Sequence, residues 1–179
     1  MLYTIVSAGA SAAELAALQA AETYGIPTGG LAVPDWANDR GDPAALLRDR
    51  FGLHLGPEDP AARLMANAAS ADATLLCCLD FTTPGTVHAL RILGSLGKPY
   101  LPFRLTPGAG HARVQAWLLE HQVRTLHITG NRERASRPSV FHLTTQLLWR
   151  LFAACGHTPR TASVAAGEAS NRRGTLATV

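Results

Sequence analysis

The chain has 179 residues, a length typical of a single domain, and its hydrophobic share of 47% excludes an intrinsically disordered protein. Its longest apolar runs are far too short to cross a bilayer and no leader-like segment begins the sequence, so we expect a soluble cytoplasmic protein with no membrane partner. Three cysteines cannot form an even disulfide framework, which indicates reduced, buried thiols.

The net charge of +3 is unevenly distributed along the chain. Residues 1–103 carry 6 basic and 10 acidic side chains, whereas residues 104–179 carry 10 and 3, and every basic residue except Lys98 is arginine. The planar arginine fork suits phosphate or carboxylate, which favours an anionic partner, although an arginine-rich composition also follows from genome base composition. The arginines after residue 156 form no basic run, so a nucleic-acid partner is not expected.

The first predicted elements are an apolar, β-branched strand over 2–6 and a helix over 12–24. Ser11 and Glu14 have the spacing of a capping box at the start of this helix. Gly25 suits the left-handed conformation that commonly ends a helix.

The next segment predicts a short strand and two helices. The strand is expected over 31–33, and a weak pattern predicts a short helix over 43–51. A stronger helix follows over 60–70, with Asp59 as its N-cap and Pro60 at its first position.

From residue 73 onward strands and helices alternate regularly. The expected strands are 73–79, 100–103 and 124–129, and the expected helices are 84–96, 112–121 and 138–155. Five strands alternating with helices predict a Rossmann-like, doubly wound α/β fold, with a mainly parallel five-stranded sheet and helices on both faces. We therefore expect one domain over 1–155. Because 156–179 lacks apolar periodicity, a flexible C-terminal tail is predicted there.

Four loops are expected at the carboxyl edge of this sheet, where ligands bind in open α/β folds. Glycine lets an anion approach the backbone, hydroxyl groups donate hydrogen bonds, and arginine pairs with the anion. Each loop alone is better explained as an ordinary turn, and only their shared position favours a pocket. The candidate binding residues are Gly9, Ser11, Gly29, Gly30, Thr82, Thr83, Gly85, Thr86, Gly130, Asn131 and Arg132.

No pattern predicts catalytic or metal-ligating residues. The seven histidines are scattered without metal-site spacing, and no nucleophile-elbow motif is present. Cys77 and Cys78 are adjacent in an expected strand, so their thiols should point to opposite faces and be inert. Trp36 lies in a polar loop, where its ring needs either a partner surface or a ligand ring, and both interpretations stay open.

Several short motifs are informative through their order and spacing. They are NAASADATL at 67–75, PGT at 84–86, GKP at 97–99, AWL at 116–118 and GNRE at 130–133, preceded by SAG at 7–9 and GIPTGG at 25–30. In this succession the chain resembles, over about residues 2–152, the family of molybdenum-cofactor carriers. That family is a branch of the Rossmann-like group that includes the lonely-guy phosphoribohydrolases and DNA-processing protein A.

The resemblance implies a parallel α/β protein that oligomerises and holds a nucleotide-like or pterin-type phosphorylated ligand. The first loop departs from the family pattern Gly-Gly-Gln-Thr-Gly, because 8–12 reads AGASA and its methyl groups narrow the approach of a phosphate. Glu14 stands where the family has Asp. The lonely-guy signature places its catalytic glutamate at Ala89, and alanine cannot transfer protons, which leaves Asp80 and Glu133 as the nearby carboxylates.

We therefore expect a binding protein, rather than an enzyme, for a phosphorylated nucleotide-like or molybdopterin-type ligand. It would act as a molybdenum-cofactor carrier or hold a nucleotide, and would form a homo-oligomer. One alternative is a nucleoside-monophosphate N-glycosidase of the phosphoribohydrolase type, which only fold analogy favours. The other is a degenerate interaction module that binds no ligand, which the lost glycines of the first loop favour.

Overall fold

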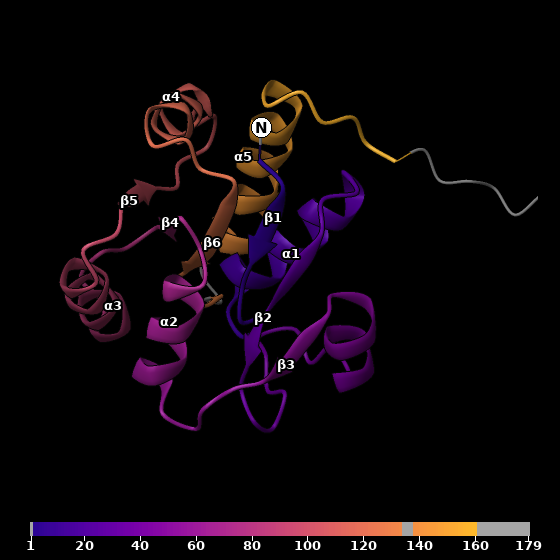
Figure 1. Cartoon of the computed structure of the whole chain (residues 1–179), viewed down its shortest axis with the longest axis vertical. Helices are drawn as coiled ribbons and strands as arrows, with labels where there is room; N and C mark the ends of the chain where they lie inside the picture. The colour runs from indigo at the N-terminus through magenta and orange to yellow at the C-terminus, as the bar shows by residue number, and fades with distance from the viewer. Residues whose placement is uncertain (1, 134–137, 161–179) are drawn as a thin grey trace, which may run out of the picture.

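The computed structural model describes residues 2–133 and 138–160, in which six parallel strands form one sheet between two layers of helices (Figure 1). The strands are β1 (Thr4–Val6), β2 (Thr28–Ala32), β3 (Leu53–Leu55), β4 (Ala73–Cys78), β5 (Tyr100–Arg104) and β6 (Thr125–Gly130). The helices are α1 (Ala12–Thr23), the π-helical turn η1 (Leu46–Arg50), α2 (Pro60–Ala69), α3 (Pro84–Ser95), α4 (Ala112–Glu120) and α5 (Val140–Ala154). The predicted Rossmann-like α/β class is confirmed.

The sheet has the strand order β3-β2-β1-β6-β4-β5, one strand more than the sequence predicts. The additional strand is β3, which pairs Leu53 with Gly30 and Leu55 with Ala32 of β2. Three residues are too few to show an alternating pattern, so β3 is defined only by its long-range pairing.

The second strand begins earlier than predicted, because Gly29 and Gly30 pair within β2 instead of forming a turn before it. At Gly30 a Cβ would lie 2.3 Å from the carbonyl oxygen of Ser7, and φ is +136°. Glycine is therefore required by the close passage of two neighbouring strands, a contact that the local sequence does not reveal.

The starts of α1, α2 and α3 agree with the sequence, and a short-range side-chain cap determines each of them. Ser11 and Glu14 form the predicted capping box, and the Asp59 carboxylate accepts hydrogen bonds from the first turn of α2. The Thr83 hydroxyl likewise accepts from the Thr86 N–H at the start of α3. The predicted helix over 43–51 contains the single π-helical turn η1.

Alternate residues of β4 enter two separate hydrophobic clusters. Leu75 and Cys77 pack with α1, α4 and α5, whereas Leu76 and Cys78 pack with α2 and α3. Figure 1 shows these helix groups on opposite sides of the sheet. Burial raises the pKa of both thiols, that of Cys78 to about 11. The predicted opposite orientation of the two cysteines is confirmed.

The chain beyond α5 returns toward the C-terminal end of α1. The His157 ring contacts Phe152 edge to face, and the Arg160 N–H donates to the Thr23 carbonyl oxygen at 2.7 Å. The remainder of the expected tail, 161–179, lies outside the described residues. In the described ranges, no helix is long and apolar enough to cross a membrane.

Candidate functional site

A cavity of about 420 Å³ opens at the carboxyl edge of the sheet, within the usual size range of small-molecule sites. Because β6 lies between β1 and β4, the segments that follow these three strands meet around it, and α2 adds a further wall. Seven predicted site residues line the cavity: Ser11, Thr83, Gly85, Thr86, Gly130, Asn131 and Arg132.

The other four predicted residues lie away from the cavity lining. Gly9 faces the side chains of Leu18, Leu47 and Leu53, and Gly29 and Gly30 belong to β2. The Thr82 hydroxyl donates to the Asp80 carboxylate at 2.6 Å. These positions serve the packing and turns of the fold and are not brought to the cavity surface.

At the α1 end of the cavity, formed by residues 8–14, a carboxylate of the protein occupies the helix N-terminus. Glu14 is 8% exposed, and its Oε2 accepts hydrogen bonds from the N–H groups of Ala10 at 2.9 Å and Ser11 at 3.0 Å. Its Oε1 accepts from the Thr129 hydroxyl at 2.8 Å. The Ala10 and Ser11 N–H groups of the first loop are thus satisfied internally.

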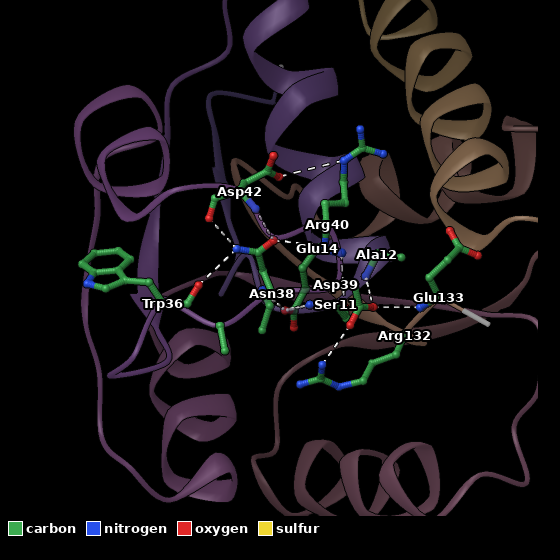
Figure 2. A network of polar contacts seen from close by, with 12 residues as sticks. Ser11, Ala12, Glu14, Trp36, Asn38, Asp39, Arg40, Asp42, Arg132 and Glu133 are labelled. Atoms are coloured by element: carbon green, nitrogen blue, oxygen red, sulfur yellow. Dashed lines mark hydrogen bonds and ion pairs between the residues drawn. The ribbon is translucent and has the colours of Figure 1, made fainter. Parts of the chain in front are cut away.

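A second carboxylate, Asp39, closes the same end from the loop after β2 (Figure 2). Its Oδ2 accepts from the N–H groups of Ala12 at 2.9 Å and Glu133 at 2.7 Å, and its Oδ1 accepts from Arg132 Nη1 at 2.8 Å. The Arg132 side chain remains two-thirds exposed. The arginine predicted to pair with a ligand therefore pairs with Asp39.

Trp36 lies in the same loop in a left-handed conformation, with φ of +59°. Its ring packs against the cluster that contains Leu18, Leu47 and Phe51, and Figure 2 shows it directed away from Asp39 and Arg132. The structure matches neither of the two interpretations left open for this tryptophan, because the ring packs against the protein's own core.

At the α3 end of the cavity, formed by residues 83–89, the helix N-terminus is open. Pro84 has no N–H, and no described residue accepts a hydrogen bond from the Gly85 N–H. A Cβ built on Gly85 meets no atom within 4 Å, so the backbone there faces empty space. This is the geometry in which a helix N-terminus accepts an anion.

Asn131 holds the α3 end in place. Its Oδ1 accepts from the N–H groups of Leu79 at 2.8 Å and Asp80 at 3.0 Å. Its Nδ2 donates to the Thr86 hydroxyl at 2.8 Å and to the Asp80 carbonyl oxygen at 3.2 Å. These four bonds make Asn131 a positioning residue that fixes the loop after β4 on the end of β6.

Two cavity residues on α2 have no counterpart in the sequence prediction. The Asn67 side chain bonds both backbone groups of Leu31. Arg63 is 8% exposed and donates through Nη1 to the Pro57 carbonyl oxygen at 2.7 Å, and no carboxylate of a described residue pairs with it. Arg63 and Asn67 are four residues apart on an alanine-rich helix, and this spacing indicates from the sequence that they share a face.

The floor of the cavity includes His127 of β6, which is 1% exposed and lies 3.1 Å from the Thr74 hydroxyl through Nδ1. Burial lowers the pKa of His127 to about 3, because the charged imidazolium is poorly solvated there. The ring is therefore neutral at physiological pH.

The carboxylates considered for acid–base chemistry lie elsewhere. Asp80 binds Thr82, and Glu133 accepts from the Ser139 hydroxyl and the Val140 N–H at the start of α5. Neither lines the cavity, whereas Ala89, at the position of the lonely-guy glutamate, does. Among the described residues, no cluster of three His, Cys, Asp or Glu side chains has the geometry to hold a metal ion.

Comparisons with known proteins agree with this architecture. The solved structure of a protein named "Putative molybdenum carrier protein" from Syntrophus aciditrophicus SB superposes with a TM-score of 0.71. It is 24% identical, and the alignment covers 84% of this chain and 94% of that one, which establishes the shared fold. A search of curated proteins finds no match.

The sequence profile of the circularly permutated YpsA SLOG family matches residues 5–152, which include every strand and helix described above except Thr4 at the start of β1 and the last two residues of α5. With the structural neighbour, this match confirms the resemblance expected from the sequence motifs. The chain belongs to the circularly permutated YpsA SLOG family.

Proposed function

We propose that this protein binds a phosphorylated small molecule, nucleotide-like or of the molybdopterin type, with the phosphate at the α3 end of the cavity. The observation that carries the proposal is that an open helix N-terminus and a buried arginine, which has no acidic partner among the described residues, line the same cavity. Both belong to one cavity of about 420 Å³.

The α3 N-terminus supplies the first part of the phosphate subsite. The Gly85 N–H points out of the helix, and the partial positive charge of the helix end favours an anion. Thr86 and Thr83 are fixed by their mutual hydrogen bond at 2.8 Å, and Thr86 is also held by Asn131. The helix end is thus held in place before a ligand arrives, which lowers the entropy cost of binding.

Arg63 supplies the second part. A buried guanidinium without a counter-ion is costly, and an incoming phosphate would both neutralise it and accept bidentate hydrogen bonds. The Arg63 side chain passes beside Gly56, where a Cβ would lie 3.1 Å from its Cδ. The glycine makes room for the arginine stem, and Arg63 is one of the residues that line the cavity.

The chemical groups that line the cavity determine which part of a molybdenum-carrying ligand the protein could recognise. The buried Cys77 and Cys78 thiols have raised pKa values and do not line the cavity, so they do not offer thiolate ligands. Arginine and backbone N–H groups instead suit oxyanions. A molybdopterin would therefore be recognised by its phosphate, as a nucleotide would.

Binding without turnover is the simpler proposal for this cavity. Ala89 supplies no carboxylate, and both oxygens of Glu14 accept hydrogen bonds from the protein. The homo-oligomer and the cytoplasmic location stay predictions from the sequence.

Calorimetric titration with inorganic phosphate and with adenosine monophosphate tests the proposal. Gly85→Val should weaken both affinities at least tenfold, because the side chain would fill the space over the α3 N-terminus, while the circular dichroism spectrum stays unchanged. Gly110→Val is the matched control, since Gly110 also has open space around its Cβ but lies outside the cavity. Equal affinities for the wild type and Gly85→Val, or no binding by the wild type, would refute the proposal.

A further inference from the structure

The α1 end of the cavity differs chemically from the proposed phosphate subsite because every N–H of its first helical turn already has an acceptor. Ala12 donates to Asp39, Ala13 to the Asn131 carbonyl oxygen, and Glu14 to the Ser11 hydroxyl. The Glu14 carboxylate accepts hydrogen bonds from the N–H groups of Ala10 and Ser11, just before the helix. An anion arriving at this helix end would find no unused N–H group in the first helical turn and would meet the Glu14 carboxylate.

The Glu14 carboxylate can still accept a further hydrogen bond from a ligand. A carboxylate offers about four lone-pair positions, and three donors of the protein bind Glu14. All three are donors, so the acceptor-only carboxylate form is satisfied and held rigidly. Because Glu14 lines the cavity, the ligand group opposite it must be a donor, such as a hydroxyl or an amine.

The two ends of the cavity therefore impose a direction on the ligand. Arg63 and the α3 N-terminus take the anionic group, the neutral His127 lies on the floor, and Glu14 takes a donor and repels a second anion. We infer that Glu14 is a specificity-determining residue, which selects ligands with one phosphate and a hydroxyl or amino group away from it, and rejects ligands with phosphates at both positions. This inference rests on the proposed function.

The test compares adenosine monophosphate, whose ribose hydroxyls lie away from its phosphate, with adenosine 3′,5′-bisphosphate, in which one of those hydroxyls is phosphorylated. Wild-type protein should bind the monophosphate at least tenfold more tightly in calorimetric titrations. Glu14→Gln keeps an oxygen acceptor for the Ala10 and Ser11 N–H groups but removes the charge, so it should reduce this preference at least fivefold. Glu22→Gln is the matched control, because Glu22 lies on the same helix outside the cavity.

The outcomes separate this inference from the function on which it rests. Wild-type protein that binds neither nucleotide refutes both. Tight binding of the monophosphate, together with an unchanged preference in a folded Glu14→Gln variant, refutes the role of Glu14 alone. If the variant does not fold, the wild type decides: its preference should decrease as salt is raised, because salt screens the repulsion, and equal affinity for both nucleotides at low salt overturns the inference.

Discussion

The N-termini of α1 and α3 lie at the same edge of the sheet, and each helix is capped by a hydroxyl side chain that accepts a hydrogen bond from its own first turn. In sequence they look equivalent, since both follow a strand through a turn rich in small residues. In the structure, carboxylates of the protein fill the first, whereas the second opens into the cavity beside Arg63.

The difference shows that a helix N-terminus is open to a ligand only where the fold has not already supplied an anion. Glu14 supplies this negative charge from within the helix itself, because it lies three residues after Ser11. Asp39 supplies a second negative charge from a distant part of the chain, the loop after β2. Together they turn a potential phosphate site into a structural support, whereas the N-terminus of α3 stays open.

The largest expected effect separates two glycines that the sequence treats alike. A Cβ at Gly130 would lie 2.0 Å from the Cys77 carbonyl oxygen, whereas a Cβ at Gly85 meets nothing within 4 Å. Gly130→Ala should lower the free energy of unfolding by about 3 kcal/mol or more, and Gly85→Ala should change it by about 0.5 kcal/mol at most. Urea denaturation measures both, and similar losses for the two variants would contradict the assignment of Gly85 to open space.

A second prediction concerns His127, on the floor of the cavity, and the dependence of stability on pH. The pKa of His127 is about 3 in the folded protein and 6.5 ordinarily, so between these values the unfolded chain binds the extra proton. His127 should therefore make stability fall as pH decreases from about 6.5 toward 3, by at most about 1.4 kcal/mol per pH unit. Denaturation of the wild type and His127→Asn across this range isolates the effect from other titrating groups. Parallel curves would show that the pKa of His127 is the same in the folded and the unfolded protein.

A third prediction tests the proposed phosphate subsite through Arg63, which lies on α2. Arg63→Met keeps the unbranched stem beside Gly56 but removes the charge. Loss of a charged hydrogen-bonding group of about 1.5–3 kcal/mol should weaken adenosine monophosphate binding by roughly tenfold to a hundredfold. Arg113→Met on the exposed surface of α4 is the control for net charge. Equal losses in both variants would indicate general electrostatic attraction instead of a contact in the cavity.

The smallest effect is expected at the α1 end of the cavity, where carboxylates of the protein occupy the helix N-terminus. Asp39→Asn retains an acceptor for the Ala12 N–H but releases Arg132 from its ion pair, and this guanidinium is two-thirds exposed. Affinity for inorganic phosphate should rise about two- to fivefold, as expected when one exposed ion pair of up to about 1 kcal/mol is lost. The gain should disappear in the double variant with Arg132→Ala. A gain that persists there would come from reduced repulsion alone.

Features encoded by neighbouring residues were predictable from the sequence. The capping box of Ser11 and Glu14 and the Asp59-Pro60 start of α2 each span a few residues, and the structure confirms them. The alternate orientation of Cys77 and Cys78 follows from strand geometry alone. The fold class could be derived from such elements because parallel strands restrict how they are connected.

Features that depend on distant contacts could not be read in this way. Gly30 looked like part of a turn because its requirement comes from Ser7 on the neighbouring strand. Arg132 looked available because its partner Asp39 is 93 residues away in sequence. Arg63 was hidden in an alanine-rich helix, and only the placement of α2 beside the strand ends reveals that it is buried at the cavity.

The opposed cysteines of β4 have a practical consequence for measuring these affinities. The chain has three cysteines, and burial on the two faces of the sheet shields two of them from reagents. Cys155 is half-buried at the C-terminal end of α5, the end of the helix that points away from the strand edge where the cavity opens. A maleimide dye should attach there selectively, giving a fluorescent reporter of tumbling and assembly that leaves the ligand cavity untouched.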